Sequence, residues 1–244
     1  MSQNIKVIIL AGGMGTRLPE YTKKIPKPMV KINGVPIIIH IMSHYIKFGF
    51  KKFIIATGYK GEVFQKYFKG YKKNGLSFKA KILKKQCEIT LLRTGLKTLT
   101  GGRLKRVSKY LKDQDDFMFT YGDGLSDVNL LKLFNFHKSK KKLVTVTAVR
   151  PPARFGELEI KDKIVTSFKE KPQVASGWIN GGYFVAKKKF LSLIEGDLTI
   201  LEKTPLEKAS KKKQLAAYQH YKFWKCMDTK RDKDVLESTY KKKI

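Results

Sequence analysis

The sequence predicts an α/β fold: a doubly wound, mostly parallel sheet with an added antiparallel β-hairpin region. Three apolar runs, at residues 7–10, 53–56 and 117–120, lack the alternation of a half-exposed strand. Such runs are typical of parallel strands that are buried on both faces. Helical segments at residues 36–48 and 62–68 follow the first two runs. Strands that alternate with helices in this way predict one sheet with right-handed crossovers.

Length and composition indicate one domain that spans residues 1–244. Hydrophobic residues make up 42% of the chain, which is enough for a substantial core. No apolar run approaches about 20 residues, so we expect no transmembrane helix. The N-terminus leads directly into a strand, so we expect no signal peptide. Cys87 and Cys226 are far apart and lack metal-ligand spacing, which favours a reducing cytoplasm.

The net charge of +32 is the most unusual property of the chain. It comes from 45 Lys and 7 Arg, and Lys runs such as residues 140–142 and 211–213 fall at expected loops and helix ends. Phosphate clamps and base-reading sites favour Arg over Lys. We therefore favour a solvated basic surface that helps to recruit anionic substrates over a specific nucleic-acid partner.

A glycine-rich loop follows the first strand directly. It comprises Ala11, Gly12, Gly13, Met14, Gly15 and Thr16, and Arg17 comes next. Glycines let the backbone approach a ligand, and successive N–H groups in such a turn form an anion site. The spacing matches neither a Walker A loop nor the dinucleotide fingerprint. A purely structural turn is the alternative, but the strand before the loop and the Arg fork after it favour a phosphate cradle.

Lys27 lies between Pro26 and Pro28, shortly after this loop. Proline on both sides stiffens the backbone and predicts an extended segment. A rigidly held ammonium group suits a phosphate. A surface Lys in a proline turn is the alternative, and the position just after the cradle makes it the less favoured one.

These motifs resemble the signature of a known family. GGMGTRL followed by IPKPM is similar to the sugar-1-phosphate nucleotidyltransferases, which join a sugar phosphate to a nucleoside triphosphate and release pyrophosphate. The resemblance continues through TYGDG, EKP, NGGYFV and MDTKRDK to about residue 236. It implies a Rossmann-like sheet of the nucleotidyltransferase type, with nucleotide contacts from Leu10 to Arg17, at Lys27 and at Gly122.

The segment TGGRLKRV, residues 100–107, resembles the glucose-1-phosphate cytidylyltransferase branch more closely than its uridylyl or thymidylyl relatives. It follows a strand expected at residues 89–95. Thr100 can cap a helix that extends to residue 111. Gly101 and Gly102 leave room for a ligand at the positive end of that helix.

Base choice gives this segment a chemical role. Cytosine differs from uracil by an amino donor at position 4, so a CTP site needs an acceptor there and can use a donor at O2. We predict that backbone carbonyls of residues 10–12 supply the acceptor. Arg103, with Thr98 beside it, reaches O2. The alternative is that Arg103 is a surface helix residue and Thr98 a loop hydroxyl.

Asp123 follows the strand at residues 117–120, between two glycines. Open α/β sheets place ligand chemistry at this edge, although an Asp-Gly hairpin turn is an equal alternative in isolation. The resemblance implies that Asp123 and Asp228, the latter in MDTKRDK, hold one Mg²⁺. This ion prefers carboxylate and phosphate oxygens.

The sugar-phosphate side is implied by the resemblance of EKP followed by NGG. Lys171 would contact the phosphate, Glu170 and Asn180 would contact sugar hydroxyls, and Gly181 would lie beside them. An exposed turn is the alternative for EKP alone.

Further elements follow from patterning. We expect strands at residues 143–149, 178–185 and 215–218, a hairpin of residues 154–160 with 164–168, and edge structure or a loop at residues 74–86. We expect helices at residues 127–137, 187–194 and 206–213, and a last helix to residue 240. Asp127 would cap the first of these and leave His137 facing solvent at its end. Thr229 or Asp232 would cap the last.

The implied reaction is attack of a sugar-1-phosphate oxygen on the α-phosphorus of CTP. Arg17 would neutralise the β- and γ-phosphates, Lys27 would lie at the α-phosphate, and Asp123 would act through the metal. The family forms homo-oligomers and supplies activated hexoses for deoxysugars of surface polysaccharide. Two alternatives remain: use of UTP or dTTP, and a non-catalytic regulatory or basic binding subunit.

Overall fold

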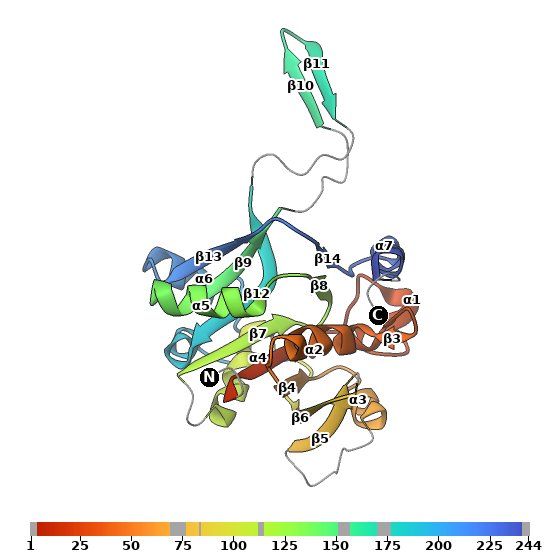
Figure 1. Ribbon diagram of the computed structural model, residues 1–244, viewed down its shortest axis with the longest axis vertical. Coiled ribbons are helices and arrows are strands. Elements are labelled where there is room, and N and C mark those ends of the chain that lie inside the picture. Colours follow the sequence, from red (N-terminus) through yellow and green to blue (C-terminus); the bar gives the residue numbers. More distant parts are fainter. Residues whose placement is uncertain are drawn as a thin grey trace.

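The computed structural model describes residues 4–68, 77–82, 84–111, 115–150, 157–169 and 177–240. An eight-stranded sheet forms its centre, in the order β13-β9-β12-β7-β1-β4-β6-β5 (Figure 1). The strands are β1 (Lys6–Ala11), β4 (Lys52–Thr57), β5 (Ser77–Ile82), β6 (Lys85–Arg93), β7 (Asp116–Tyr121), β9 (Val144–Val149), β12 (Ile179–Lys187) and β13 (Leu215–His220).

The pairing of these strands confirms the predicted doubly wound topology. β1 runs parallel to β4 on one side and to β7 on the other, and β4 runs parallel to β6. Antiparallel pairing is confined to β5 at one edge and to β12, which lies between β7 and β9. The chain leaves β1 toward β4 and returns on the other side at β7, so the order reverses at β1. Open α/β sheets bind ligands in the crevice beyond the carboxyl ends at such a point.

Helices cover both faces of the sheet. They are α1 (Pro19–Thr22), α2 (Ile37–Lys47), α3 (Glu62–Tyr67), α4 (Thr100–Val107), α5 (Leu130–Lys140), α6 (Thr204–Lys211) and α7 (Lys230–Tyr240), with 3₁₀ turns η2 (Lys27–Met29), η3 (Ser108–Tyr110) and η4 (Lys188–Leu193). α2 and α5 pack on one face, in a core that includes Val7 and Ile9. α4, α6 and η4 pack on the other, with Ile8 and Leu10. Burial on both faces explains why these strands read as unbroken apolar runs.

Several local expectations were wrong at element ends. β12 extends to Lys187, and the helix expected over residues 187–194 is present as the 3₁₀ helix η4 and not as an α-helix. Asn129, not Asp127, caps α5, because its side chain accepts a hydrogen bond from the Lys132 N–H at 2.9 Å. His137 is fully buried instead of facing solvent, since its Nδ1 lies 2.8 Å from the Thr145 hydroxyl of β9.

Two segments of the N-terminal half also differ from expectation. Lys27 lies in the 3₁₀ turn η2 instead of an extended segment; Pro28 is tolerated there because the first N–H groups of a helical turn have no partner within it. Thr100 begins α4 but does not cap it, and its hydroxyl donates to Glu202 instead. The edge structure expected near residues 74–86 is confirmed by β5 for the residues described there.

Three small ribbons complete the fold: β2 (Lys31–Ile32) with β3 (Val35–Pro36), β8 (Gly124–Ser126) with β14 (Trp224–Cys226), and β10 (Glu157–Lys161) with β11 (Ile164–Lys169). The last confirms the predicted hairpin, whose turn residues Asp162 and Lys163 both have positive φ. Figure 1 shows this hairpin well away from the main sheet. The predicted residues 154–156 lie outside the described part of the chain.

Candidate active site

The site forms where the carboxyl ends of β1 and β7 meet. The Gly122 N–H donates to the Leu10 carbonyl at 3.1 Å, which joins the two strand ends. A Cβ atom on Gly122 would lie 2.7 Å from the Pro28 ring, so only glycine lets the turn that carries Lys27 pack this closely. The predicted cradle, the predicted lysine and the strand that leads to Asp123 therefore meet at one place.

The rim of the glycine-rich loop is open. Gly15 has φ +67°, a conformation that favours glycine, and its carbonyl accepts from the Leu18 N–H and the Thr22 hydroxyl. A Cβ atom on Gly13 would meet nothing within 4 Å. Gly13, Met14, Thr16 and Arg17 are exposed. This stretch has the space that a phosphate ligand requires.

Arg103 lies beneath this loop and is only 4% exposed. Its guanidinium donates to the carbonyls of Gly12 and Gly95, at 2.9 and 2.8 Å, and to the Thr94 hydroxyl at 2.7 Å. A Cβ atom on Gly12 would lie 2.1 Å from the same guanidinium. Burial, followed by the charge of Arg106, lowers the pKa of Arg103. The alternative interpretation, in which Arg103 is a surface helix residue, is thus wrong. The hydrogen bonds of Arg103 join the ends of β1 and β6.

The glycine pair before Arg103 has a packing role. The N–H groups of Gly101 and Gly102 donate to the Thr199 carbonyl, at 2.9 and 3.3 Å. A Cβ atom on Gly102 would lie 2.3 Å from the Asp197 carbonyl oxygen. The close neighbour of this helix start is therefore the chain's own loop between η4 and α6, where the sequence suggested a ligand.

A hollow of about 290 Å³ opens next to Arg103, at the carboxyl ends of β4 and β6. Its lining includes Gly58, Tyr59, Arg93, Gly95 and Leu96. The carbonyls of Gly95 and Leu96 both accept from Arg103. Thr98, predicted to face the base, is 5% exposed.

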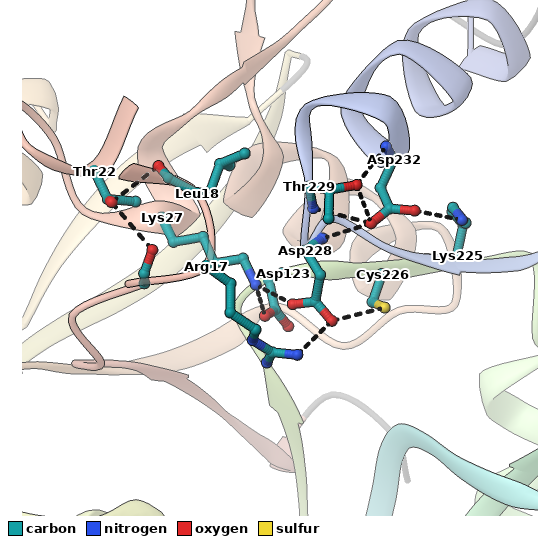
Figure 2. A network of polar contacts seen from close by, with 11 residues as sticks. Arg17, Leu18, Thr22, Lys27, Asp123, Lys225, Cys226, Asp228, Thr229 and Asp232 are labelled. Atoms are coloured by element: carbon teal, nitrogen blue, oxygen red, sulfur yellow. Dashed lines mark hydrogen bonds and ion pairs between the residues drawn. The ribbon is translucent and has the colours of Figure 1, made fainter. Parts of the chain in front are cut away.

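The four charged residues predicted for catalysis and metal binding converge in one network (Figure 2). The Lys27 ammonium lies 2.7 Å from Asp123 Oδ2 and 2.7 Å from Asp228 Oδ1. Arg17 Nη1 lies 2.8 Å from Asp228 Oδ2. The Lys27 side chain is 7% exposed and that of Arg17 is 72% exposed, so one cation is enclosed and the other faces solvent.

A short ribbon explains how residues 105 positions apart meet. β8 and β14 pair in antiparallel register, with Gly124 opposite Cys226. Asp123 precedes β8 and residue 227 follows β14, so the pairing continues as a Met227 N–H bond to the Asp123 carbonyl at 2.9 Å. Asp228 is the next residue, and its carboxylate reaches the same ammonium group.

The start of α7 holds the backbone of Asp228. The Asp232 carboxylate accepts from the N–H groups of Asp228 and Thr229, at 3.2 and 2.9 Å, and the Thr229 hydroxyl accepts from the Asp232 N–H. This is a reciprocal capping arrangement, and it confirms both Thr229 and Asp232 as capping residues. Lys225 pairs with the remaining Asp232 oxygen at 2.5 Å. The helix end thus fixes the loop that carries a predicted metal ligand.

The charges in this network shift the ionisation of its members. Burial would lower the pKa of Lys27, but the charge and hydrogen bonds of Asp123 and Asp228 outweigh it and raise that pKa above 10.5. Burial would raise the pKa of Asp228, but Lys27 and then Arg17 hold it below 3.8. Burial and the neighbouring carboxylates raise the pKa of the Cys226 thiol to about 12, which keeps it unreactive. The shifts of Lys27 and Asp228 therefore both favour the charged form.

The donor set fits the implied Mg²⁺. Two carboxylate oxygens, from Asp123 and Asp228, already converge on one cation, the Lys27 ammonium. Mg²⁺ is commonly bound by one or two carboxylates together with waters and substrate phosphates. In the part of the chain that the structure describes, no group of three or more His, Cys, Asp or Glu side chains is suited to a metal. The two carboxylates are the metal ligands that the fold offers here.

The predicted sugar side is only partly described. Glu170 and Lys171 lie outside the described residues. Asn180 is exposed, and its amide donates to the Tyr121 hydroxyl at 3.2 Å. Gly181 is buried against β9, and its carbonyl accepts from the Trp224 indole at 2.6 Å. Asn180 and Asp123 lie at the same end of the sheet, because β12 pairs with β7.

Sequence reasoning missed two polar residues at this end. The Tyr121 hydroxyl donates to Glu202 at 2.5 Å, and the Thr100 hydroxyl donates to the other Glu202 oxygen at 2.8 Å. Tyr121 stands in the TYGDG segment and was detectable from its place before Asp123. Glu202 lies in a loop with no motif, and only the fold brings it here.

Comparisons with known proteins bear on the family and the fold of the chain. A family model described as nucleotidyl transferase matches residues 6–232. A glucose-1-phosphate cytidylyltransferase of Salmonella typhimurium is 45% identical over 98% of this chain and 96% of the relative. A probable glucose-1-phosphate cytidylyltransferase of Bacillus subtilis is 40% identical over 96% and 94%. A solved UDP-glucose pyrophosphorylase in complex with UDP-glucose superposes with a TM-score of 0.72 at 18% identity, over 98% and 99% of the two chains. This last likeness bears on the fold alone.

Proposed function

The chain belongs to the nucleotidyl transferase family, and from this premise we propose that it transfers a cytidylyl group from CTP to α-D-glucose 1-phosphate. The products are CDP-glucose and pyrophosphate. The observation that carries the proposal is the convergence of Arg17, Lys27, Asp123 and Asp228 at the β1–β7 crevice. The choice of CTP and glucose 1-phosphate is supported by the full-length similarity to the cytidylyltransferases.

The reaction joins two anions, so the main task of the protein is to hold negative charges together. A phosphate oxygen of the sugar 1-phosphate forms a bond to the α-phosphorus of CTP. The bond from that phosphorus to the oxygen that bridges to the β-phosphorus breaks, and pyrophosphate leaves with the electron pair. Lys27, enclosed and rigidly placed, neutralises the α-phosphate, where both reactants meet. Arg17, exposed at the rim, contacts the β- and γ-phosphates as they enter.

Asp123 and Asp228 would hold the Mg²⁺ that this chemistry uses. When bound, this ion neutralises phosphate charge and orients the triphosphate. The carboxylates keep their place because the β8–β14 ribbon and the start of α7 fix both backbones. Their negative charge also favours the protonated form of Lys27. When substrate binds, phosphate oxygens replace the carboxylates as acceptors of its hydrogen bonds.

Base selection uses the hollow beside Arg103. The sequence assigns the carbonyls of residues 10–12 to the cytosine amino group and Arg103 with Thr98 to the O2 side. In this structure the Leu10 carbonyl accepts from Gly122, and the Gly12 carbonyl accepts from Tyr59 and Arg103, so a base would have to share or replace these bonds. Arg103 donates to four carbonyls and a hydroxyl in this structure, so it shapes the pocket in addition to any contact with the base. The observation that supports this part is that the hollow is lined by Gly95 and by Tyr59, whose N–H donates to the Gly12 carbonyl at 3.1 Å.

We also propose a homo-oligomer and a cytoplasmic location. The β10–β11 hairpin stands off the main sheet (Figure 1). Ile160, Ile164 and Phe168 are 64–67% exposed, which is unusual for a group of large apolar residues. A second copy of the chain would cover them. Both cysteines are free, as in a reducing compartment. No helix among the described residues is long and apolar enough to cross a bilayer.

Two alternatives remain: a nucleotidyltransferase that uses UTP or dTTP, and a non-catalytic subunit. The test is to incubate purified protein with glucose 1-phosphate, Mg²⁺ and each nucleotide in turn, and to measure the release of pyrophosphate. This measurement distinguishes the proposed CTP-dependent enzyme from both alternatives. We expect CTP to be preferred to UTP by at least about tenfold, which corresponds to about 1.4 kcal/mol. Equal use of UTP or dTTP would overturn the base assignment. No release with any nucleotide, from protein that is folded, would favour the non-catalytic subunit.

A further inference from the structure

A chain of hydrogen bonds at the end of the main sheet has no role in the chemistry above. It runs from the Thr100 hydroxyl to Glu202, from the Tyr121 hydroxyl to the other oxygen of Glu202, and from the Asn180 amide to Tyr121. It links the start of α4, on the nucleotide side, with β12, on the predicted sugar side. Asp123 follows Tyr121 by two residues, so this series of hydrogen bonds borders the reacting centre.

The surroundings of Glu202 are unusual for this protein. The sequence contains 52 Lys and Arg residues, yet within the described ranges the ion pairs leave out the Glu202 carboxylate. Hydroxyl donors hold it instead, although the residue is exposed. An exposed side chain loses conformational entropy when it is fixed in this way. A carboxylate has about four lone-pair sites, and two bonds leave roughly half of them for a ligand.

Tyr121 fixes the position of this carboxylate. Its ring packs against Gly182, where a Cβ atom would lie 2.8 Å away, and meets Phe184 edge-on at 5.9 Å. Its hydroxyl donates to the Glu202 carboxylate at 2.5 Å. Its hydroxyl accepts from Asn180 at the same time. Tyr121 is thus a positioning residue, and Glu202 has the free acceptor sites.

We infer that Glu202 accepts hydrogen bonds from hydroxyl groups of the sugar in the sugar 1-phosphate and thereby contributes to sugar specificity. A carboxylate repels phosphate and favours hydroxyl donors, so it suits the hexose ring and not its phosphate. The phosphates are drawn to Arg17 and Lys27 instead. This inference rests on the proposed function, since it assigns a contact to one of its two substrates.

The test compares Glu202→Gln with the wild type. Glu195→Gln is the matched control. It makes the same change in the same segment, on a carboxylate whose side chain is 73% exposed and pairs with Lys208. We expect Glu202→Gln to raise the KM for glucose 1-phosphate by about tenfold or more and to leave the KM for CTP unchanged. The Glu195→Gln control should match the wild type in both.

Deoxy analogues identify the contact itself. A series of 2-, 3-, 4- and 6-deoxyglucose 1-phosphates is measured with each protein. At least one analogue should bind the wild type about tenfold more weakly than the parent compound, and should show no such penalty in Glu202→Gln. Tyr121→Phe should raise the same KM, and the double variant should be no worse than Glu202→Gln alone. A merely structural role would instead lower melting temperature and affect both substrates.

Calorimetric titration with glucose 1-phosphate in the presence of a non-reactive CTP analogue needs no turnover. Weaker binding to Glu202→Gln than to wild type supports the inference. The inference is overturned if wild type and Glu202→Gln bind glucose 1-phosphate with equal affinity, or if wild type does not bind it. It is also overturned if, for every deoxy analogue, the loss from the missing hydroxyl adds to the loss from the substitution. Failure of the proposed function appears separately, as wild-type protein that binds the sugar phosphate but releases no pyrophosphate.

Discussion

Lys27→Met tests the enclosed ion-pair network most directly. Met has nearly the same length but no charge, so it removes one ammonium group and leaves the backbone of η2 intact. Asp123 Oδ2 and Asp228 Oδ1 each lie 2.7 Å from that ammonium, so the two carboxylate oxygens are at most about twice that distance apart. Without Lys27, two negative charges face each other across about 5 Å.

The magnitude follows from this geometry. At an effective dielectric constant of about 20, the repulsion at this distance is about 3 kcal/mol. Removal of one partner from a buried pair costs about 3–5 kcal/mol, and the carboxylates here are 14–26% exposed, which reduces that cost. Asp228 also keeps Arg17. We expect the free energy of unfolding at neutral pH to fall by about 2–4 kcal/mol.

The pH dependence has a defined sign. The wild-type pKa of Asp228 is depressed, so its stabilising contribution is present above pH 3.8 and is lost as the pH falls through the lowered value. The pKa of Lys27 is raised, so its contribution is present below pH 10.5 and is lost as the pH rises through the raised value. In Lys27→Met, protonation relieves the repulsion. The difference in stability between wild type and variant should therefore shrink as the pH falls below 3.8.

Denaturant unfolding across this pH range, with and without excess Mg²⁺, is the assay. Mg²⁺ alone should stabilise Lys27→Met, whose carboxylates have lost their shared cation, and should stabilise the wild type much less. Lys208→Met is the control, since Lys208 forms an equally short pair with Glu195 on the exposed surface, where such pairs contribute little to stability. The reasoning is refuted if Lys27→Met is as stable as Lys208→Met at neutral pH and does not respond to Mg²⁺.

Three further predictions concern the cradle and its supports. Arg17→Ala should weaken CTP binding by about 1.5–3 kcal/mol and leave binding of the sugar phosphate unchanged, while Lys171→Ala should do the reverse. Steady-state KM values for the two substrates are the measurement. Equal losses for both substrates in both variants would contradict the assignment of Arg17 to the nucleotide and Lys171 to the sugar phosphate. Gly102→Ala should lower unfolding free energy by about 1–3 kcal/mol because its Cβ would meet the Asp197 carbonyl at 2.3 Å, whereas Gly13→Ala should not, and similar melting temperatures would count against the packing role. Arg103→Ala should lower both the free energy of unfolding and the affinity for CTP, since it leaves several buried acceptors without a donor. An unchanged free energy of unfolding would show that the ends of β1 and β6 do not need these hydrogen bonds.

The sequence predicted the sheet because burial on both faces leaves a strong trace. Val7, Ile8 and Ile9 are all fully buried, and such a run has few structural alternatives. The charged centre could also be predicted from the sequence, since Arg17, Lys27, Asp123 and Asp228 each lie in a motif with a chemical rationale. What brings them together, the pairing of β8 with β14, involves only three residues on each side and has no comparable signal.

The remaining differences are tertiary. His137 appeared to be a helix-end residue, but the last turn of α5 packs on β9 and buries it. Gly101 and Gly102 suggested a ligand because the distant loop that packs on them, near Thr199, could not be foreseen. Glu202 lies in that same loop. The loop that packs on the glycine pair lies more than 90 residues further along the chain, and local patterning does not carry that information.

If Asp123 and Asp228 hold the metal, as proposed, the charge balance of the site predicts that metal and nucleotide bind together. Two cations, Arg17 and Lys27, neutralise two carboxylates, Asp123 and Asp228, so the network has no net charge by itself. Phosphates can engage both cations fully only if another cation takes their place at the carboxylates. Mg²⁺ in turn can reach those carboxylates only if Lys27 finds other acceptors, which phosphate oxygens provide. Each ligand therefore removes an obstacle to the other, and their binding is coupled through Lys27. The basic surface draws in any polyanion, but only one that arrives with a divalent cation satisfies both carboxylates and both cationic side chains.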